Sequence, residues 1–275
     1  MLRDKVIIVT GAASGMGRST ARKCAELGAS VVVADLNADG ARTVAEDIAA
    51  AGGSAISYGV DLTVEDEVSG LADAAIKNFG RINALHNNAY AVHPGAATDV
   101  ASTSLEAWDW TIRTCLTSQF LCCRAVIPHM LEIGGGSIIN VSSGNGLAGS
   151  TTAAAYGAAK AGVISLVKTF ADELGRYGIR ANAVAPGNEG SGNEDQPPHE
   201  YAVDGISPLA APRAHDVANA ALFLCSELAA RITGQTLVVD GGATIQQLWG
   251  LPASSIPPNP DDAIPEFMKP RRWGS

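Results

Sequence analysis

The sequence predicts a single α/β domain built on a doubly wound parallel sheet. Short apolar runs, several rich in β-branched residues, alternate along the chain with longer helical patterns, as strands and crossover helices do in such a sheet. The first run, K-V-I-I-V-T at 5–10, has the composition of a strand that is covered on both faces. The 275 residues, 47% of them hydrophobic and 17% charged, are enough for one large buried core.

The alternation continues to residue 240. Strands are expected at 5–10, 30–34, 55–60, 82–87, 136–141, 179–185 and 235–240. Helices are expected at 18–27, 37–51, 64–79, 104–130 and 214–228, and one that contains Tyr156 should end near Tyr177. Thr63 is a plausible N-cap for the third helix. The long helix is expected to kink before Pro128, because proline has no N–H to donate.

Two segments depart from this pattern. Residues 188–208 are rich in Gly, Pro, Asn and acidic residues, which is typical of either a lid or a disordered loop. In the C-terminal extension, 245–275, recurring prolines exclude a long helix, so this tail either wraps over a neighbouring surface or hangs free. We find no repeats and no second hydrophobic core, and predict one domain over 1–275 with its core at 5–242.

Composition excludes several classes of function. The net charge of −9 and a pI near 5.0, with no basic block before K-P-R-R near the C-terminus, argue against a nucleic-acid partner. No apolar run reaches the roughly 18 residues of a membrane span, and no signal peptide is recognisable. The five cysteines lack C-x-x-C spacing and indicate reduced thiols in a cytoplasmic protein. The histidines show no ligand spacing, so no metal is expected.

A glycine-rich turn joins the first strand to the first helix. Its residues are Gly11-Ala12-Ala13-Ser14-Gly15-Met16-Gly17. Glycines let the backbone approach a pyrophosphate closely, and the helix N-terminus offers free N–H groups and a favourable dipole. The spacing differs from the commoner G-x-G-x-x-G, and an ordinary strand-to-helix turn is the alternative. Three glycines in this context nevertheless favour a dinucleotide site.

Asp35 stands at the end of the second strand. A carboxylate there can bind both ribose hydroxyls of an adenosine and would repel a 2′-phosphate. No Arg or Lys lies within the glycine turn or directly after Asp35 to offset that repulsion. The sequence therefore favours NAD over NADP. The alternative role of Asp35, as N-cap of the next helix, can be taken by Asn37.

Tyr156 and Lys160 are four residues apart in a run of small, mostly helix-favouring residues. On a helix they lie on one face, so the lysine charge should lower the pKa of the tyrosine from its ordinary value of about 10. Such a phenol is a usable general acid or base. Alone the spacing is weak evidence, because it is also common on solvated helix faces.

The motif residues share one location in the predicted sheet. Gly11, Asp35, Asp61, Asn87 and the pair Ser142-Ser143 all stand at the carboxyl ends of strands. Right-handed crossovers bring these ends to one edge of a parallel sheet. We therefore expect them to share one ligand.

Taken together, the motifs resemble the short-chain dehydrogenase/reductase family in its shorter form, with a Rossmann-type fold. The resemblance covers roughly 5–242. It rests on T-G-A-A-S-G-M-G at Thr10, Asp35, D-L-T at Asp61, N-N-A at Asn87, S-S at Ser142, Y-G-A-A-K at Tyr156, P-G at Pro186 and V-D-G-G at Val239.

The resemblance implies roles for these residues. Tyr156 would exchange a proton with the substrate oxygen, Lys160 would assist it and bind the nicotinamide ribose, and Ser143 would hydrogen-bond the substrate oxygen. Asn87 would support the adenosine side. The cofactor-binding set is Gly11, Ser14, Gly15, Met16, Gly17, Asp35, Asp61, Leu62, Asn88, Tyr156, Lys160, Pro186 and Gly187. The substrate-binding set is Ser143, Asn145, Tyr156 and His93, although an exposed loop histidine is the simpler interpretation of His93.

Three positions depart from the family pattern. Cys115 stands where an asparagine usually supports a proton relay, so the relay should be impaired, rerouted or unnecessary. Tyr90 replaces the glycine of N-N-A-G and adds bulk near the cofactor. The threonine that commonly follows P-G is missing, and Ser191 is the nearest substitute.

The function expected from these features is NAD-dependent hydride transfer between nicotinamide and a secondary alcohol or ketone, cyclic or hydrophobic. The alternative is an NAD(H)-binding sensor or scaffold with little catalysis, which the three departures favour and the intact Ser143, Tyr156 and Lys160 oppose. A lyase or epimerase on the same fold has no positive signal. The resemblance also implies a homo-oligomer, either a tetramer or a dimer.

Overall fold

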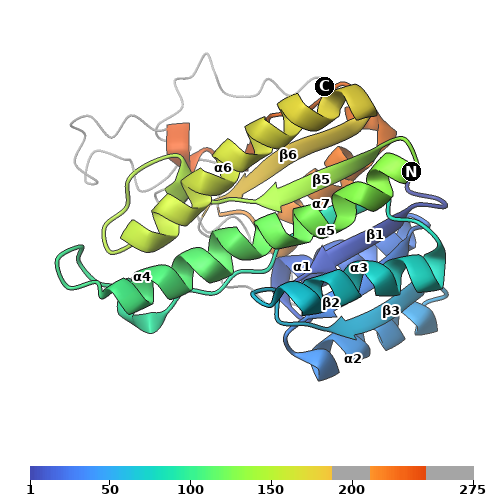
Figure 1. Cartoon of the computed structure of the whole chain (residues 1–275), viewed down its shortest axis with the longest axis horizontal. Coiled ribbons are helices and arrows are strands. Elements are labelled where there is room, and N and C mark those ends of the chain that lie inside the picture. Colours follow the sequence, from blue (N-terminus) through green and yellow to red (C-terminus); the bar gives the residue numbers. More distant parts are fainter. Residues whose placement is uncertain (188–210, 246–275) are drawn as a thin grey trace, which may run out of the picture.

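A computed structural model describes residues 1–187 and 211–245. It contains one seven-stranded parallel sheet in the order β3-β2-β1-β4-β5-β6-β7. The strands are β1 (Val6–Thr10), β2 (Ser30–Asp35), β3 (Ser54–Gly59), β4 (Ala84–Asn87), β5 (Gly136–Val141), β6 (Ile179–Pro186) and β7 (Thr236–Val239). The helices are α1 (Gly15–Glu26), α2 (Ala38–Ala50), α3 (Glu65–Phe79), α4 (Leu105–Ile112), α5 (Ser118–Glu132), α6 (Ala154–Leu174) and α7 (Ala214–Cys225). The predicted Rossmann-type doubly wound fold is confirmed (Figure 1).

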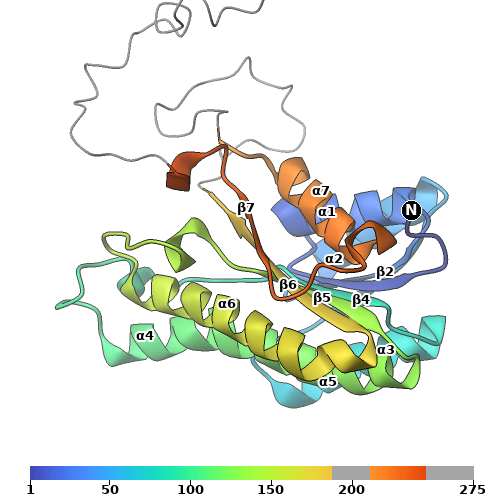
Figure 2. The same cartoon turned by 90° about the horizontal axis from the view of Figure 1, so that it is seen from above.

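Helices cover both faces of the sheet. Figure 2 shows α1, α2 and α7 on one side and α3, α4, α5 and α6 on the other. The side chains of β1 divide accordingly, since Ile7 and Val9 join the core under α1 and α7 whereas Ile8 joins the core under α3 and α5. Successive strand residues point to opposite faces, so a run of apolar residues supplies both cores.

The strand order reverses between β1 and β4. From β1 the chain winds outward through β2 to β3, then crosses back to β4 beside β1 and continues outward to β7. Ligands of open α/β sheets bind at such a switch point, beyond the carboxyl ends of the strands. Those ends are aligned, because Thr10 pairs with Ala34 and Asn87 pairs with Asn140.

The predicted long helix is not one continuous α-helix. It divides into α4 and α5, separated by a π-helical turn at Arg113–Thr117 in which the Ser118 N–H bonds to the Arg113 carbonyl. The extra residue in such a turn shifts the side chains that follow it, and π turns are frequent at functional sites. Cys115 lies within this turn and is buried.

Pro128 lies inside α5, and the helix continues beyond it to Glu132. The interruption of the long helix is therefore at residues 113–117, upstream of the expected position. Pro128 does remove one N–H from the ladder, which frees the carbonyl of Arg124. Both residues line a surface hollow, so this side of α5 faces solvent.

Other element ends differ from expectation by a few residues. Thr63 is not the N-cap of α3, because the helix begins at Glu65 and the capping residue is Val64, which makes no side-chain cap. Thr63 instead donates its backbone N–H and its hydroxyl to Asp61. Asn37 does cap α2, by accepting a hydrogen bond from Gly40 N–H.

Several expectations fall outside the described residues. These are the lid segment 188–208, Ser191 and nearly all of the tail 245–275. Of the helices that the structure describes, none combines the length and apolar character needed to cross a bilayer. The same residues contain no group of three or more His, Cys, Asp or Glu side chains arranged to hold a metal ion.

His86 in β4 is a fully buried titratable group. Its side chain has no exposed surface, and neither ring nitrogen finds a hydrogen-bond partner in the described part of the chain. Burial lowers the pKa of His86 from its ordinary 6.5 to about 4. The folded protein therefore holds this imidazole neutral at pH values where an unfolded chain would protonate it.

We expect His86 to make the fold acid-sensitive. Because its folded pKa is depressed, its contribution to stability is complete above pH 6.5 and is lost as the pH falls toward 4, by about 3 kcal/mol in all. Urea unfolding of wild type and His86→Leu between pH 7.5 and 4 measures the difference in the slope of stability with pH. His215→Gln, which changes a half-exposed histidine, serves as the control. Equal slopes for wild type and His86→Leu would contradict the prediction.

Candidate active site

The glycine turn is packed too tightly for side chains at two of its positions. A Cβ on Gly17 would come within 2.1 Å of the Gly11 carbonyl oxygen and 2.7 Å of Asn88 Nδ2. A Cβ on Gly11, whose φ is +63°, would come within 2.8 Å of Ala89 Cα. Asn88 completes this packing by donating from Nδ2 to the carbonyl oxygens of Thr10 and Gly11. These contacts fix the turn against the loop that follows β4.

The outer side of the same turn is open. Gly15 has a φ of +52°, and a Cβ built on it would meet nothing within 4 Å. Ser14 precedes α1 without capping it through its side chain, and the first turn of the helix carries no acidic residue. Ser14 and Gly15 are exposed, whereas the side chain of Met16 is buried in the core. The free N–H groups and the open backbone fit the pyrophosphate of a dinucleotide.

Asp35 connects the turn to the second strand. Its Oδ2 accepts a hydrogen bond from Ala13 N–H at 2.9 Å, and its Oδ1 accepts one from Asn37 N–H at 2.9 Å. Each carboxylate oxygen keeps acceptor capacity beyond these bonds. The carboxylate is therefore held in one orientation beside the turn, where it can still bind ribose hydroxyls.

Asp61 and Leu62 follow β3 and Val60. Asp61 Oδ1 accepts hydrogen bonds from the N–H and the hydroxyl of Thr63, while the Asp61 N–H donates to Glu67 Oε2 at 2.7 Å. Leu62 is half-buried and packs on the core under α3. The structure thus places both residues in a rigid turn at the carboxyl edge of the sheet.

Asn87 and Asn88 point in opposite directions. Asn88 faces the glycine turn, whereas Asn87 is buried on the other face, where its Nδ2 donates to Asn140 Oδ1 at 3.0 Å and to the Gln119 carbonyl at 3.2 Å. Asn87 therefore joins β4 to β5 and α5, and it does not face the turn that would bind the adenosine side. The expectation that Asn87 supports that side is therefore not met, whereas Asn88, which belongs to the predicted cofactor-binding set, does face the glycine turn.

Lys160 is the centre of the proposed catalytic group. It is completely buried in α6, and its Nζ donates to the Val141 carbonyl at 2.8 Å. Nζ also lies 5.6 Å from the centre of the Tyr156 ring and 5.3 Å from that of the Tyr90 ring. Burial lowers the pKa of Lys160 from 10.5 to about 8, while the nearby Cys115 acts in the opposite direction. The predicted proximity of Tyr156 and Lys160 is thus present in the structure.

The loop that carries Ser143 lies along the first turns of α6. Gly146 lies so close to the Lys160 backbone that a Cβ there would be 2.7 Å from its carbonyl carbon. Ser142, which is buried, donates its hydroxyl to the Lys160 carbonyl at 2.8 Å. Ser143 is partly exposed, and its Oγ accepts from Asn145 N–H at 3.2 Å. This packing brings Ser143 and Asn145 to the helix that carries Tyr156.

Cys115 is bound to the loop after β4. Its Sγ donates to the Ala91 carbonyl at 3.0 Å, and the neighbouring Thr114 hydroxyl donates to the same oxygen at 2.7 Å. The π-helical turn therefore fixes the segment that begins at Tyr90. No bond from Cys115 to Lys160 accompanies this arrangement in the described residues.

His93 follows in the same segment. Its Nδ1 accepts from Gly95 N–H at 3.0 Å, which leaves the proton of the neutral ring on Nε2. Its ring meets the edge of Trp110 on α4, with centroids 5.6 Å apart. Trp110 was not among the predicted site residues, because α4 is not at a strand end.

Pro186 and Gly187 end β6 beside β7. Gly187 N–H donates to the Val239 carbonyl at 2.9 Å, and a Cβ on Gly187 would lie 2.7 Å from Asp240 Cβ. A Cβ on Gly144, in the serine loop, would be 3.7 Å from the Pro186 carbonyl oxygen. The turn therefore borders the loop that carries Ser143, at the same edge of the sheet.

Sequence reasoning missed two further supporting side chains. Thr10 Oγ1 accepts hydrogen bonds from the N–H groups of Asn88 and Ala89. Gln119 Nε2 donates to the Val141 carbonyl at 3.0 Å, the same oxygen that Lys160 uses. Thr10 could have been recognised from its place before Gly11, but nothing in the sequence links Gln119 to Lys160.

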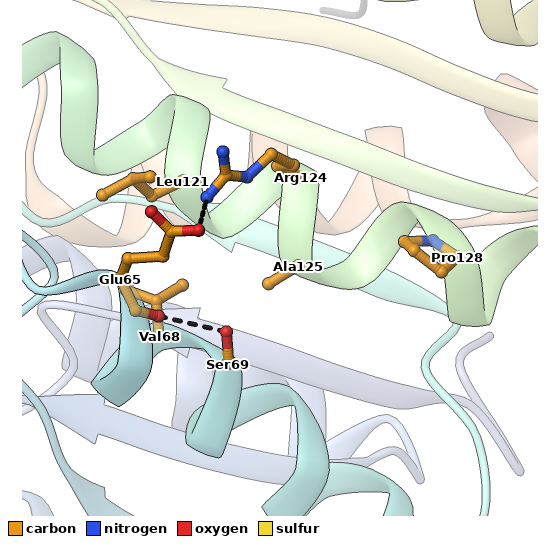
Figure 3. A pocket seen from close by; sticks show the side chains of 7 residues that line it. All are labelled: Glu65, Val68, Ser69, Leu121, Arg124, Ala125 and Pro128. Atoms are coloured by element: carbon orange, nitrogen blue, oxygen red, sulfur yellow. Dashed lines mark hydrogen bonds and ion pairs between the residues drawn. The ribbon is translucent and has the colours of Figure 1, made fainter.

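Two surface hollows lie away from these residues. One, of about 180 Å³, lies between α3 and α5, where Glu65 and Arg124 point toward each other and form an ion pair (Figure 3). The other, of about 480 Å³, is lined by α2, β3 and α3. No predicted site residue lines either hollow, so neither is a candidate for the substrate pocket.

Comparisons with known proteins find relatives that match almost the whole chain. Residues 11–244 match the family profile described as enoyl-(acyl carrier protein) reductase. The cis-4-hydroxycyclohexanecarboxylate dehydrogenase of Sinomonas cyclohexanicum is 40% identical over 246 residues, which are 88% of this chain and 97% of that protein. The 2,5-dichloro-2,5-cyclohexadiene-1,4-diol dehydrogenase LinX of Sphingobium indicum is 36% identical and covers 89% of this chain and 98% of its own.

A solved structure is similar over the same range. It is a crystal structure of a short-chain dehydrogenase/reductase from Burkholderia xenovorans, with a TM-score of 0.80 and 33% sequence identity. The match covers 89% of this chain and 98% of that one.

The close packing around Gly17 predicts that one methyl group added at this position weakens cofactor binding. In Gly17→Ala the new Cβ collides with the Gly11 carbonyl and Asn88, so the turn must shift, and we expect the Kd for NADH to rise at least about tenfold. Fluorescence titration with NADH measures this. Gly52→Ala is the matched control, since Gly52 also has a positive φ, +84°, but lies in open space after α2. Equal Kd values for the two variants would contradict the assignment.

Proposed function

Because this chain belongs to the short-chain dehydrogenase/reductase family, we propose that it transfers a hydride between NAD and a secondary alcohol or ketone, cyclic or hydrophobic. Membership of the family itself makes the chain an oxidoreductase with a nicotinamide cofactor. The observation that carries the finer proposal is the buried ammonium of Lys160 beside the ring of Tyr156.

The proposed proton chemistry follows from that pair. When bound, the nicotinamide supplies or accepts the hydride. Tyr156 exchanges a proton with the substrate oxygen, and Ser143 donates a hydrogen bond to that oxygen. The charge of Lys160 favours the phenolate form of Tyr156, and burial strengthens this interaction because little solvent screens it.

The proposed substrate is a small cyclic or hydrophobic secondary alcohol, or the matching ketone. Support comes from relatives whose names describe dehydrogenases of cyclohexane and cyclohexadiene alcohols and of a hydroxysteroid. Another relative is a D-threitol dehydrogenase, which acts on an open-chain polyol. On this chain the substrate side would be formed by Ser143, Asn145 and His93, with the ring of Tyr90 beside Tyr156.

The preference for NAD is proposed from Asp35. Its carboxylate is fixed next to the glycine turn by two backbone N–H groups. A 2′-phosphate at this place would meet like charge. We also propose a cytoplasmic homo-oligomer, a tetramer or dimer, in which α4 and α5 bury the exposed Trp110 and Phe120.

Replacement of Asp35 should change the choice of cofactor. Wild type should bind NADH at least about tenfold more tightly than NADPH, and Asp35→Ser should lose most of that difference, because the repulsion and the ribose hydrogen bonds are removed together. Fluorescence titrations with both cofactors measure it. Asp39→Ser, at an exposed aspartate in the first turn of α2, is the control. Tighter binding of NADPH by wild type would overturn the NAD proposal.

Tyr156→Phe tests catalysis against simple binding. Turnover of a panel of cyclic and open-chain ketones with NADH should fall by about 10²–10⁴-fold, because the phenol that supplies the proton is absent. NADH binding, measured by fluorescence, should persist. Tyr58→Phe, in β3, is the control. If wild type binds NADH but reduces none of the ketones, the binding-only alternative gains support, and Cys115→Asn becomes the next variant to assay.

A further inference from the structure

Tyr90 is placed against the catalytic pair by a rigid loop. The two residues before it are anchored to β1, since the N–H groups of Asn88 and Ala89 both donate to Thr10 Oγ1. The residue after it, Ala91, accepts hydrogen bonds from Thr114 and Cys115. The backbone on both sides of Tyr90 is therefore held in place.

The ring of Tyr90 contacts both members of the pair. Its centroid lies 6.0 Å from that of Tyr156, with the planes tilted by 50°. It lies 5.3 Å from Lys160 Nζ, slightly closer than the ring of Tyr156 at 5.6 Å. Both distances fall within the range of cation–π attraction. The ammonium of Lys160 thus faces two aromatic rings, one from its own helix and one from the loop after β4.

Little else in the described residues stabilises that charge. On the β5 side Lys160 donates to the Val141 carbonyl, and on the side of the π-helical turn its pKa is affected by the nearby Cys115 thiol, which donates to the Ala91 carbonyl. Within residues 1–187 and 211–245 no carboxylate comes within ion-pair distance of Lys160. A fully buried ammonium without a carboxylate depends on weaker partners to remain protonated.

We infer that Tyr90 is a positioning residue, whose ring keeps Lys160 charged and in place beside Tyr156. The inference rests on the proposed function of Tyr156 and Lys160, and it explains why a ring can stand where the sequence pattern of the family has a glycine. Loss of the ring should let Lys160 deprotonate at lower pH. The phenolate of Tyr156 then loses its neighbouring charge and forms at higher pH.

The test compares Tyr90→Phe, which keeps a ring, with Tyr90→Leu, which does not. Phenolate formation is followed by absorbance near 295 nm, and the Tyr156 contribution is isolated by subtracting the matching Tyr156→Phe double variant. We expect Tyr156 to titrate about half a pH unit higher in Tyr90→Leu than in Tyr90→Phe. The alkaline limb of the kcat profile for alcohol oxidation should move to lower pH by a similar amount.

Tyr177→Leu is the matched control. Like Tyr90, Tyr177 is about half-exposed and faces a cation, here Arg176, but it lies in the short turn between α6 and the start of β6, away from the carboxyl ends of the strands. This variant should leave both readouts unchanged. Identical titrations of Tyr156 in Tyr90→Leu and Tyr90→Phe would overturn the inference about Tyr90. Failure of the proposed function would instead appear as absent turnover in wild type, while the absorbance titration still reports on Tyr90.

Discussion

The hydrogen bond from Lys160 Nζ to the Val141 carbonyl joins the two halves of the candidate active site. It connects α6 to the end of β5, and it is the one hydrogen bond that the buried ammonium makes in the described residues, at 2.8 Å. Burying a charge is costly unless hydrogen bonds and neighbouring dipoles compensate. Around Lys160 this cost is offset by the Val141 carbonyl and by two aromatic rings. The serine loop, the π-helical turn and the loop after β4 all pack around this buried charge.

The cofactor side is built on a different constraint, which is close backbone packing. Gly17 and Gly11 touch, and Asn88 fills the space beside them with hydrogen bonds to two carbonyl groups. Because the packing leaves the outer side of Gly15 open, one short turn is both rigid and accessible. The loop after β4 takes part in both constraints, since Asn88 supports the turn and Tyr90, two residues later, faces Lys160.

Cys115 illustrates how a departure from the family pattern is accommodated. The thiol donates its hydrogen bond to the Ala91 carbonyl and so holds the loop, and in the described residues it makes no hydrogen bond to Lys160. Because Thr114 donates to the same oxygen, two hydrogen bonds from the π-helical turn hold the segment that carries Tyr90 and His93. The same segment thus links Cys115, where a relay asparagine was expected, to Tyr90, where a glycine was expected.

The sequence alone was sufficient for the fold class, the glycine turn and the spacing of Tyr156 and Lys160, because these depend on local periodicity and on neighbours within one or two helical turns. It named both Asn87 and Asn88 for the cofactor side, and only the packed sheet shows that Asn87 is buried on the other face while Asn88 faces the turn. It could not place the Val141 carbonyl, the Gln119 amide or the Tyr90 ring around Lys160. These groups come from segments far apart in the chain, and only tertiary packing brings them to one buried charge.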